Sequence, residues 1–435
     1  MEFETLDRRL NYPSRCQGIH IPVSAVATHD QVVLRGRLVE WDGRRGELGD
    51  QTGRIRLNYD GDVAICTGDI VEVSGISDAD GEIRVSEARC LAPCLRDHVG
   101  GDWLRFHEGE KSLIERLNVR SRILSCIRHF FSDRDYIEVE TPHLLNYAGC
   151  EEHIEEFETT YRSLKGSASL YLATSPELYM KRLLGVGLER FYQLGRCFRN
   201  GERSSQHNPE FTMVEWYQAY ASYEEIMEET EELVASIWSK VVGRESPLWK
   251  LVVEERPWRR ISVREAFEQW VGVDIGEHNE REDLYAALQT VGFTSAVYSD
   301  TWDDLFNKVL LEKIEPQLAL LGPVFLYDYP IQLGAMAKGK EGDGRWAERA
   351  ELYLAGTELA NGYTELNDPV EQRGRFNHAR SIQGERPVDE QFLKSMERAI
   401  PPAGGMALGV DRLVMLATEA GSIDDVLTFP MSYLS

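Results

Sequence analysis

The N-terminal part of the chain consists of short runs in which apolar and polar residues alternate. Between residues 31 and 93, Asp-Gly and other glycine turns separate runs such as VVLRGRLVEW, RIRLNY, IVEVSGI and IRVSEARCL. This pattern is typical of a small antiparallel barrel or sandwich, and a five-stranded barrel of the OB type fits this length of chain. We therefore expect residues 1–100 to form an OB-like β-barrel domain.

The pattern changes near residue 101, where helical periodicity begins. From Ser112 to Phe131, apolar residues recur at helical spacing, which predicts an amphipathic helix leading into a strand at 136–140. Further expected strands lie at 170–174, 190–200, 211–220, 323–329 and 406–410. Expected helices lie at 223–242, 281–291, 301–313 and 388–400. The alternation predicts a mixed α+β catalytic domain over residues 101–435, built on one large sheet.

The charge of the chain bears on its partners. Of 435 residues, 48 are Lys or Arg and 73 are Asp or Glu, so the net charge is 48 − 73 = −25. This excludes a broad basic surface for nucleic acid. The first 100 residues hold 12 Arg, no Lys and 17 acidic residues, a net charge of −5, so the barrel is expected to be a poor reader of nucleic acid.

Targeting and disulfide signals are absent from the sequence. No run of about 18 uncharged apolar residues occurs, so no membrane-spanning helix is expected. The first residues, MEFETLDRRL, are acidic and polar, unlike a signal peptide. The seven cysteines include no CxxC pair, which argues against disulfide scaffolding and structural zinc. We expect a cytoplasmic protein without membrane contact.

Charged residues within apolar strands are the unusual feature of the sequence, and the first cluster is FRNGERSSQHNPEFTMVEWY at 198–217. Arg199 ends one strand-like run, and an arginine there can bind a phosphate through two hydrogen bonds. The loop between the strands can fold over a nucleotide. A solvated hairpin with charges at its tip is the alternative interpretation.

Two further clusters follow. In GTELANGYTEL at 356–366, Glu358 and Glu365 are carboxylates that could bind Mg²⁺ together with phosphate oxygens, or could be two exposed acids. In GGMALGVDRLVML at 404–416, Arg412 could lie across the flat face of a ligand or pair with a phosphate. The alternative for Arg412 is an ion pair at the start of a helix.

Together the three clusters resemble the signature motifs of class II aminoacyl-tRNA synthetases, over residues 110–430. The segment 120–144 resembles motif 1, 198–217 resembles motif 2 and 404–416 resembles motif 3. The sequence segments SPELYMKRLL (175–184) and ELANGYTELNDPVEQRGRF (358–376) are similar to those of the lysyl branch of this class. The resemblance implies a class II catalytic domain, with an antiparallel sheet flanked by helices, and a homodimer.

The resemblance also implies ATP and Mg²⁺ as cofactors and assigns site residues, with Arg199 and Arg412 as catalytic residues. The implied nucleotide-binding residues are Arg199, Asn200, Glu202, Asn208, Phe211, Glu358, Leu359, Gly409 and Arg412. The implied amino acid pocket comprises Ser175, Pro176, Glu177, Glu215, Tyr217, Asn361, Glu365 and Ala407. The implied metal ligands are Glu358 and Glu365. In motif 2 the chain departs from the family by having Gly201 where a glutamate is usual, with Glu202 displaced by one position.

The acceptor of the activated amino acid is the remaining question. Ala407 stands where synthetases have glycine, and this residue, HIEEFETTY (153–161) and EWY (215–217) resemble the elongation factor P–lysine ligase. An added methyl group changes the shape of the amino acid pocket. We therefore expect lysine or β-lysine to be activated and transferred to a lysine of elongation factor P. The alternatives are a synthetase that charges tRNA(Lys), which the OB-like domain favours, and a regulatory paralogue that binds the adenylate without transfer.

Overall fold

The computed structural model of the chain describes residues 21–27, 31–61, 63–94, 99–109, 111–147, 154–164, 166–383 and 387–434. The N-terminal segment MEFETLDRRL and His153 of the segment HIEEFETTY lie outside these ranges. The chain forms two compact units that divide between Glu115 and Arg116. The division expected from the sequence, after residue 100, falls earlier in the chain.

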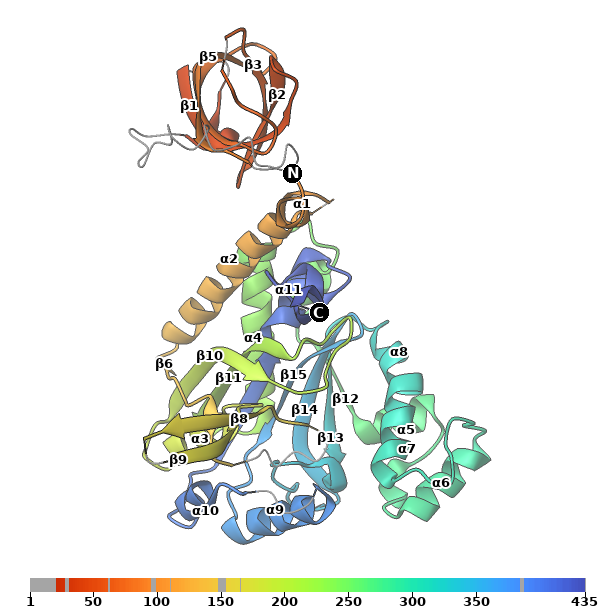
Figure 1. Cartoon of the computed structure of the whole chain (residues 1–435). Coiled ribbons are helices and arrows are strands. Elements are labelled where there is room, and N and C mark those ends of the chain that lie inside the picture. Colours follow the sequence, from red (N-terminus) through yellow and green to blue (C-terminus); the bar gives the residue numbers. More distant parts are fainter. Residues whose placement is uncertain are drawn as a thin grey trace. The chain divides into compact units, whose positions relative to one another are not determined.

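The first unit is a closed five-stranded barrel, as Figure 1 shows, with the strand order β1-β2-β3-β5-β4. The strands are β1 Gln31–Trp41, β2 Arg45–Asp50, β3 Gly53–Asn58, β4 Ile70–Ser77 and β5 Ile83–Ala92. Alternate apolar residues fill its interior, among them Leu34, Leu48, Leu57 and Val71. The structure thus confirms the predicted barrel. The sequence did not reveal β2, because RGELGD carries the glycines and charges of a turn.

One outer face of the barrel carries arginines. In the antiparallel pair β2–β3, Glu47 lies opposite Arg56 and Gly49 lies opposite Arg54. Directly opposed residues point to the same side of a sheet, so Arg54 and Arg56 share the face of Arg45 and Glu47, and the three arginines are exposed. Arg54 lies 3.8 Å from Glu47 and 3.7 Å from Glu108. The opposite face of these strands contributes to the hydrophobic core of the barrel. The net negative charge of this domain therefore coexists with a local basic strip.

The second unit contains an eight-stranded sheet in the order β12-β13-β14-β15-β16-β11-β10-β6. Its strands are β6 Ile137–Glu138, β10 Arg190–Phe198, β11 Glu210–Ala219, β12 Arg259–Ser262, β13 Val324–Pro330, β14 Trp346–Leu354, β15 Thr357–Thr364 and β16 Ala403–Gly409. All neighbours pair antiparallel except the parallel pairs β12–β13 and β10–β6. This is the expected α+β architecture around one large sheet.

Helices cover one face of this sheet. A hydrophobic core joins the sheet to α2 (Leu113–Ser132), α4 (Tyr223–Ile237) and α11 (Val410–Thr418). Because side chains alternate along a strand, one set of residues enters this core: Val214, Trp216, Met406 and Leu408. The intervening residues face the other side of the sheet: Glu215, Tyr217, Gly405 and Ala407. Polar chemistry and hydrophobic packing therefore occupy opposite faces of the same strands.

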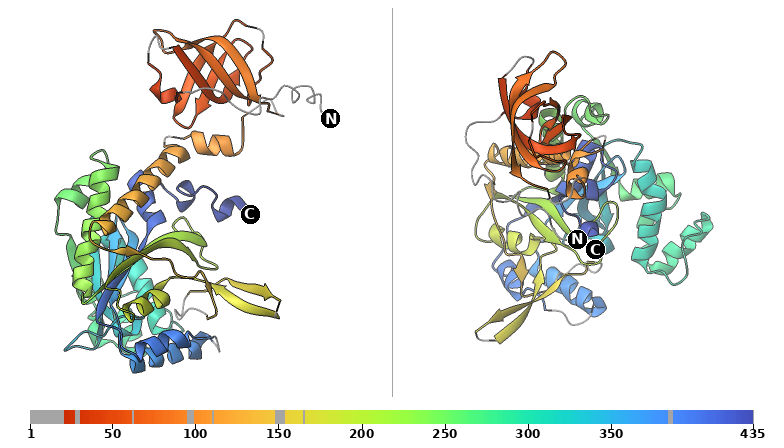
Figure 2. Two further views of the ribbon diagram at one scale, coloured as in Figure 1. Left: turned by 90° about the vertical axis from the view of Figure 1, so that its left-hand side faces the viewer. Right: turned by 45° about the horizontal axis from the view of Figure 1, so that its top comes forward.

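Smaller elements surround the open face and one edge of the sheet. The helices α3 (Glu177–Leu184), α9 (Pro369–Gln383) and α10 (Glu390–Met396) share a hydrophobic core with β10 and β11. A separate small sheet is formed by β7 Leu144–Leu145, β8 Glu158–Ser163 and β9 Gly166–Leu172. In Figure 2 the β8–β9 hairpin projects from the body of this unit. At the β12–β13 edge a helical layer has its own core, with α5 Val263–Trp270, α6 Arg281–Thr290, α7 Trp302–Val309 and α8 Glu315–Leu318.

Most predicted elements are confirmed, with shifted ends. The helix expected from Ser112 to Phe131 is α2, and those expected at 223–242 and 301–313 are α4 and α7, each continued by a π-helical turn. The structure adds β14, β15, α3, α5 and α9, none of which the sequence indicated clearly. No helix in the part of the chain that the structure describes is long and apolar enough to cross a membrane.

Candidate active site

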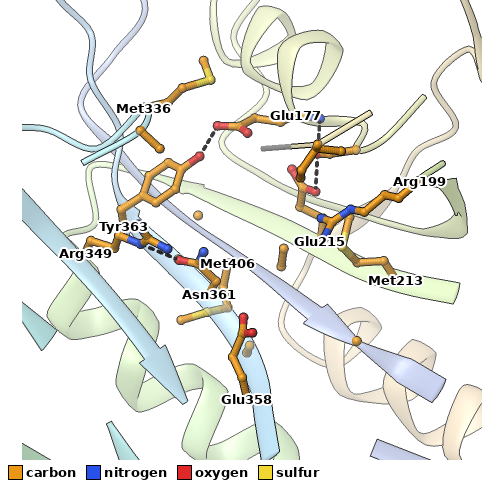
Figure 3. Close-up of a pocket in the computed structure, with 18 of the residues that line it drawn as sticks. Glu177, Arg199, Met213, Glu215, Met336, Arg349, Glu358, Asn361, Tyr363 and Met406 are labelled. Carbon is orange, nitrogen blue, oxygen red and sulfur yellow. Dashed lines mark hydrogen bonds between the residues drawn. The ribbon is translucent and has the colours of Figure 1, made fainter. Parts of the chain in front are cut away.

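A pocket of about 880 Å³ opens on the face of the sheet away from α2 and α4. Strands β11, β15 and β16 form its floor, while α3, α9 and the loop between β10 and β11 contribute its walls. Figure 3 shows how side chains from these elements point toward one another across it. All lining residues belong to the second unit.

Most residues that were predicted from the sequence as site residues line this pocket. Its lining includes Ser175, Glu177, Arg199, Glu202, Asn208, Phe211, Glu215, Tyr217, Glu358, Leu359, Asn361, Glu365, Ala407, Gly409 and Arg412. Two nominated residues are not in the lining. Pro176 precedes the first turn of α3, and Asn200 uses its amide Nδ2 to bond Glu155 Oε1 at 2.8 Å. Pro176 and Asn200 therefore lie next to the pocket and do not face it.

One end of the pocket collects carboxylates. The Glu215 carboxylate accepts hydrogen bonds from the hydroxyl groups of Tyr217, at 2.6 Å, and Ser175, at 3.0 Å. Tyr363 donates its hydroxyl to Glu177, as Figure 3 shows. Glu365 is 2% exposed and completes the group. Such a set of buried acceptors suits a ligand that carries ammonium groups.

A buried lysine sits among these carboxylates. Lys181 Nζ lies 2.6 Å from Glu177 Oε1 and 2.5 Å from Glu365 Oε2, and the side chain is 1% exposed. Burial opposes its charged form, but Glu177 and Glu365 outweigh that effect and hold the pKa of Lys181 above its ordinary value. Lys181 was not predicted as a site residue, because a lysine in an amphipathic helix normally faces solvent. Its spacing of four residues from Glu177 is the signal that could have revealed it.

Burial also changes the pKa values of the acid groups in the pocket. It raises the pKa of Glu215 to about 8, with the Glu177 carboxylate as the second cause. It raises the pKa of Glu365 to about 8 as well, although Lys181 acts in the opposite direction. At neutral pH the empty pocket therefore holds protons on these acids, which a bound ammonium group would displace.

The other end of the pocket carries arginines. Arg199 lies over the Phe211 ring, with its guanidinium carbon 5.2 Å from the ring centroid, and its Nη1 is 3.9 Å from Glu202 Oε1. Gly201 has a φ of 72°, a conformation that favours glycine. This turn brings the displaced Glu202 into the pocket, so the change in the motif does not remove a carboxylate from the site.

Arg412 crosses the pocket from the start of α11. Its Nη1 donates to the Glu358 carbonyl at 2.7 Å and lies 3.3 Å from Glu358 Oε2, while Nη2 donates to His207 Nε2 at 2.6 Å. Burial, followed by the charge of Arg412, lowers the pKa of His207, which keeps that ring neutral and able to accept. Asn208 has its amide engaged with the backbone of Glu210 and Met431, so it fixes the loop.

The residue before Arg412 has a structural role. Asp411 is 2% exposed and accepts from Arg120 Nη1 at 2.5 Å and from the Thr212 backbone N–H at 2.7 Å. The ion pair at this helix start therefore belongs to Asp411, while Arg412 is directed to the pocket. This arrangement ties α2, β11 and α11 together beneath the nucleotide-binding candidates.

The predicted metal pair, Glu358 and Glu365, stays a prediction. Both residues line the pocket, Glu358 near the start of β15 and Glu365 just after its end. Glu365 pairs with Lys181, whereas Glu358 faces Arg412. Glu351, on the neighbouring strand β14, is not in the lining, and its carboxylate pairs with an arginine of the same strand.

The residues around Glu358 still fit Mg²⁺ on one condition. Among the described residues, no group of three or more His, Cys, Asp or Glu side chains could hold a metal by itself. Mg²⁺ usually binds through one or two carboxylates plus substrate phosphates and waters. Glu358 meets that requirement only when a phosphate ligand is present.

Comparison with known proteins identifies a family and several relatives of this chain. Residues 103–433 match the family described as tRNA synthetases class II (D, K and N). The chain is 37% identical to the lysine–tRNA ligase of Carboxydothermus hydrogenoformans, over 89% of this chain and 82% of that protein. It is 36% identical to that of Halalkalibacterium halodurans, over 93% and 86%, and 34% identical to that of Synechococcus sp. strain CC9311, over 99% and 94%.

Proposed function

The chain belongs to the class II tRNA synthetases of the D, K and N group and is a ligase, and from this premise we propose that it activates lysine with ATP and transfers it to tRNA. The observation that carries the choice of amino acid is the carboxylate-rich end of the pocket. Glu177, Glu215 and Glu365 surround one internal ammonium, which leaves charge to neutralise a substrate with two ammonium groups.

The proposed reaction has two steps. The substrate carboxylate attacks the α-phosphorus of ATP in line, forming a bond to phosphorus while the bond to pyrophosphate breaks. An acceptor hydroxyl or amine then attacks the acyl carbon, and AMP leaves. The attacking carboxylate is ionised at neutral pH, so the first step needs positioning and charge stabilisation more than a general base.

The roles of the protein groups follow from their positions. Arg199 stabilises the charge on the α-phosphate, and Phe211 with Arg412 holds the adenine ring between them. Asn361 lies on the floor beside Ala407, where its amide can orient the substrate carboxylate. Mg²⁺, held at Glu358 together with phosphate oxygens, would neutralise phosphate charge.

The acceptor is proposed to be tRNA on two grounds. The three relatives compared above are named lysine–tRNA ligases, which favours the tRNA-charging alternative over the protein-modifying one. The barrel also has the exposed strip of Arg45, Arg54 and Arg56 on β2 and β3, and such strips bind nucleic acid backbones.

A protein lysine remains the second candidate acceptor, because one observation favours it. Ala407 lies directly opposite Glu215 on β11 and Asn361 on β15, at the centre of the pocket floor. Its methyl group reduces the space beside the substrate, where the tRNA-charging enzymes of the resemblance have glycine. A differently shaped amino acid such as β-lysine, and elongation factor P as acceptor, would fit this change.

One experiment separates these acceptors. The protein is incubated with ATP, Mg²⁺ and labelled lysine or (R)-β-lysine, with either tRNA(Lys) or elongation factor P, and label on each acceptor is measured. We expect label on tRNA. A variant with Arg45, Arg54 and Arg56 all changed to Glu should lose most charging and its salt dependence, but keep lysine-dependent ATP–pyrophosphate exchange. Label on elongation factor P alone would favour the second candidate, and no exchange with either amino acid would refute amino acid activation.

The glycine beneath the carboxylates gives a first prediction. A Cβ at Gly405 would lie 2.5 Å from Glu365 Oε1 and 2.7 Å from the Tyr217 ring, so Gly405→Ala must displace both. We expect the KM for lysine in ATP–pyrophosphate exchange to rise by about tenfold or more, with a smaller change in the KM for ATP. Gly421→Ala is the control, because a Cβ there meets nothing within 4 Å. Equal lysine KM values for both variants would contradict the assigned pocket.

The pH dependence of lysine binding gives a second prediction. Glu215 and Glu365 have pKa values raised to about 8 in the empty pocket, and a bound ammonium group lowers them. Binding therefore releases protons at pH 7, and lysine affinity increases as the pH rises toward about 8 and then levels off. Isothermal titration calorimetry in buffers of different ionisation enthalpy measures this release. Identical apparent enthalpies in all buffers at pH 7 would show that no proton leaves.

A further inference from the structure

The lysine at the base of the amino acid pocket has no place in the mechanism above. Lys181 lies on α3 and is 1% exposed, so it does not exchange its partners for water. Its Nζ pairs with Glu177 and Glu365, and it also lies 5.1 Å from the centroid of the Tyr363 ring. Burying an ammonium group is costly unless its partners compensate for the lost hydration. A function for this residue must explain why that cost is accepted here.

The charges around Lys181 can be counted. The groups that face this end of the pocket are the carboxyls of Glu177, Glu215 and Glu365, the hydroxyls of Tyr217 and Tyr363, and the ammonium of Lys181 itself. When all three acids are ionised, as they would be with a substrate ammonium bound, three carboxylates and one ammonium leave two negative charges. Arg349, which also lines the pocket, is neutralised by Glu351 at 2.6 Å and does not alter the sum.

We propose that Lys181 is a positioning and specificity-determining residue: its buried ammonium holds Glu177 and Glu365 in place and sets the pocket charge to match a substrate with two ammonium groups. The inference rests on the proposed function, because it concerns how the same pocket selects its amino acid. A substrate with one ammonium group would leave one carboxylate uncompensated in a buried site, which is costly.

The acid groups depend on this lysine. Lys181 Nζ lies 2.6 Å from Glu177 Oε1 and 2.5 Å from Glu365 Oε2 and so bridges the two carboxyls. Without the lysine, the two carboxyls would no longer be held toward each other. An incoming substrate ammonium would then have to reorder both side chains.

The first test is Lys181→Met, which keeps most of the length of the side chain and removes the charge. We expect the lysine KM in ATP–pyrophosphate exchange to rise by at least about tenfold, while kcat changes less than about threefold. A fall in kcat as large as the rise in KM, or an unchanged KM, would overturn the inference.

The second test uses compensation and does not depend on the stability of Lys181→Met. Glu365→Gln alone leaves the pocket with one negative charge and with Lys181 competing against the substrate. Adding Lys181→Met to Glu365→Gln restores two negative charges and removes the surplus buried ammonium. We therefore expect the double variant to have a lower lysine KM than Glu365→Gln. A higher KM for the double variant would overturn the inference.

Wild-type exchange with lysine is measured in parallel. If the wild type shows no lysine-dependent exchange, the proposed function fails. If the wild type shows lysine-dependent exchange but the lysine KM values of the variants do not follow the expected order, only the proposed role of Lys181 fails.

Discussion

Replacement of Arg199 by alanine is expected to lower the rate of lysine-dependent ATP–pyrophosphate exchange by about a hundredfold to a thousandfold. A preorganised charge directed at the reacting phosphate stabilises the transition state by roughly 3–4 kcal/mol. Arg199 is the strand-end arginine of the pocket, next to Phe211, and has Glu202 as a distant ion-pair partner at 3.9 Å. Its guanidinium is thus available to bind a phosphate. Single-turnover formation of the adenylate, measured by rapid quench, reports the step directly.

Arg203 provides a matched control in the same loop. Its Nη2 lies 3.4 Å from Asp424, its side chain is half-exposed, and it does not line the pocket. Arg203→Ala should retain nearly full adenylate formation. Arg199→Lys should recover part of the rate, because an ammonium supplies charge without the two-pronged geometry of a guanidinium. If Arg199→Ala and Arg203→Ala formed adenylate equally fast, the α-phosphate would not be held by Arg199.

The second large effect concerns stability. Asp411→Ala should lower the free energy of unfolding by about 3–5 kcal/mol, because it leaves the charge of Arg120 buried without its partner. The Asp411 carboxylate also satisfies the backbone N–H of Thr212, so the substitution removes a second hydrogen bond. Urea unfolding followed by near-ultraviolet circular dichroism gives the shift in midpoint.

An exposed ion pair supplies the comparison for this measurement. Arg373 lies 3.3 Å from Glu390, and both side chains are substantially exposed. Arg373→Ala should change stability by less than about 1 kcal/mol. Similar midpoints for Asp411→Ala and Arg373→Ala would mean that the buried pair contributes no more than a surface one.

The barrel and α2 could be predicted from the sequence because each has one face in a core and one in water, so its periodicity is clean. Strands β14 and β15 could not, because Glu351, Glu358 and Asn361 occupy positions where a simple pattern requires either apolar or solvent-facing residues. Glu358 and Asn361 face the pocket, which is neither core nor bulk water, and Glu351 is buried against Arg349. The irregular positions in the pattern are therefore the chemical ones.

The candidate site shows the same division. The motifs correctly predicted residues that lie together in one pocket, because the sequence of each motif fixes which strand carries each functional group. The predicted metal pair stays a prediction, because Glu358 and Glu365 both line the pocket but have different partners there, Arg412 for Glu358 and Lys181 for Glu365. Lys181 was not predicted because its burial also depends on Glu365 at the end of β15, and its spacing from Glu177 on the same helix does not by itself distinguish a buried pair from an exposed one.

The alternation of side chains on β11 and β16 has a consequence for engineering. Residues that enter the hydrophobic core and residues that form the pocket floor alternate along these strands. Libraries restricted to the floor positions, such as Ala407 on β16, would alter the accepted amino acid without repacking the interior. The opposite face offers an independent set of sites for raising thermal tolerance, so the two properties can be optimised separately and then combined.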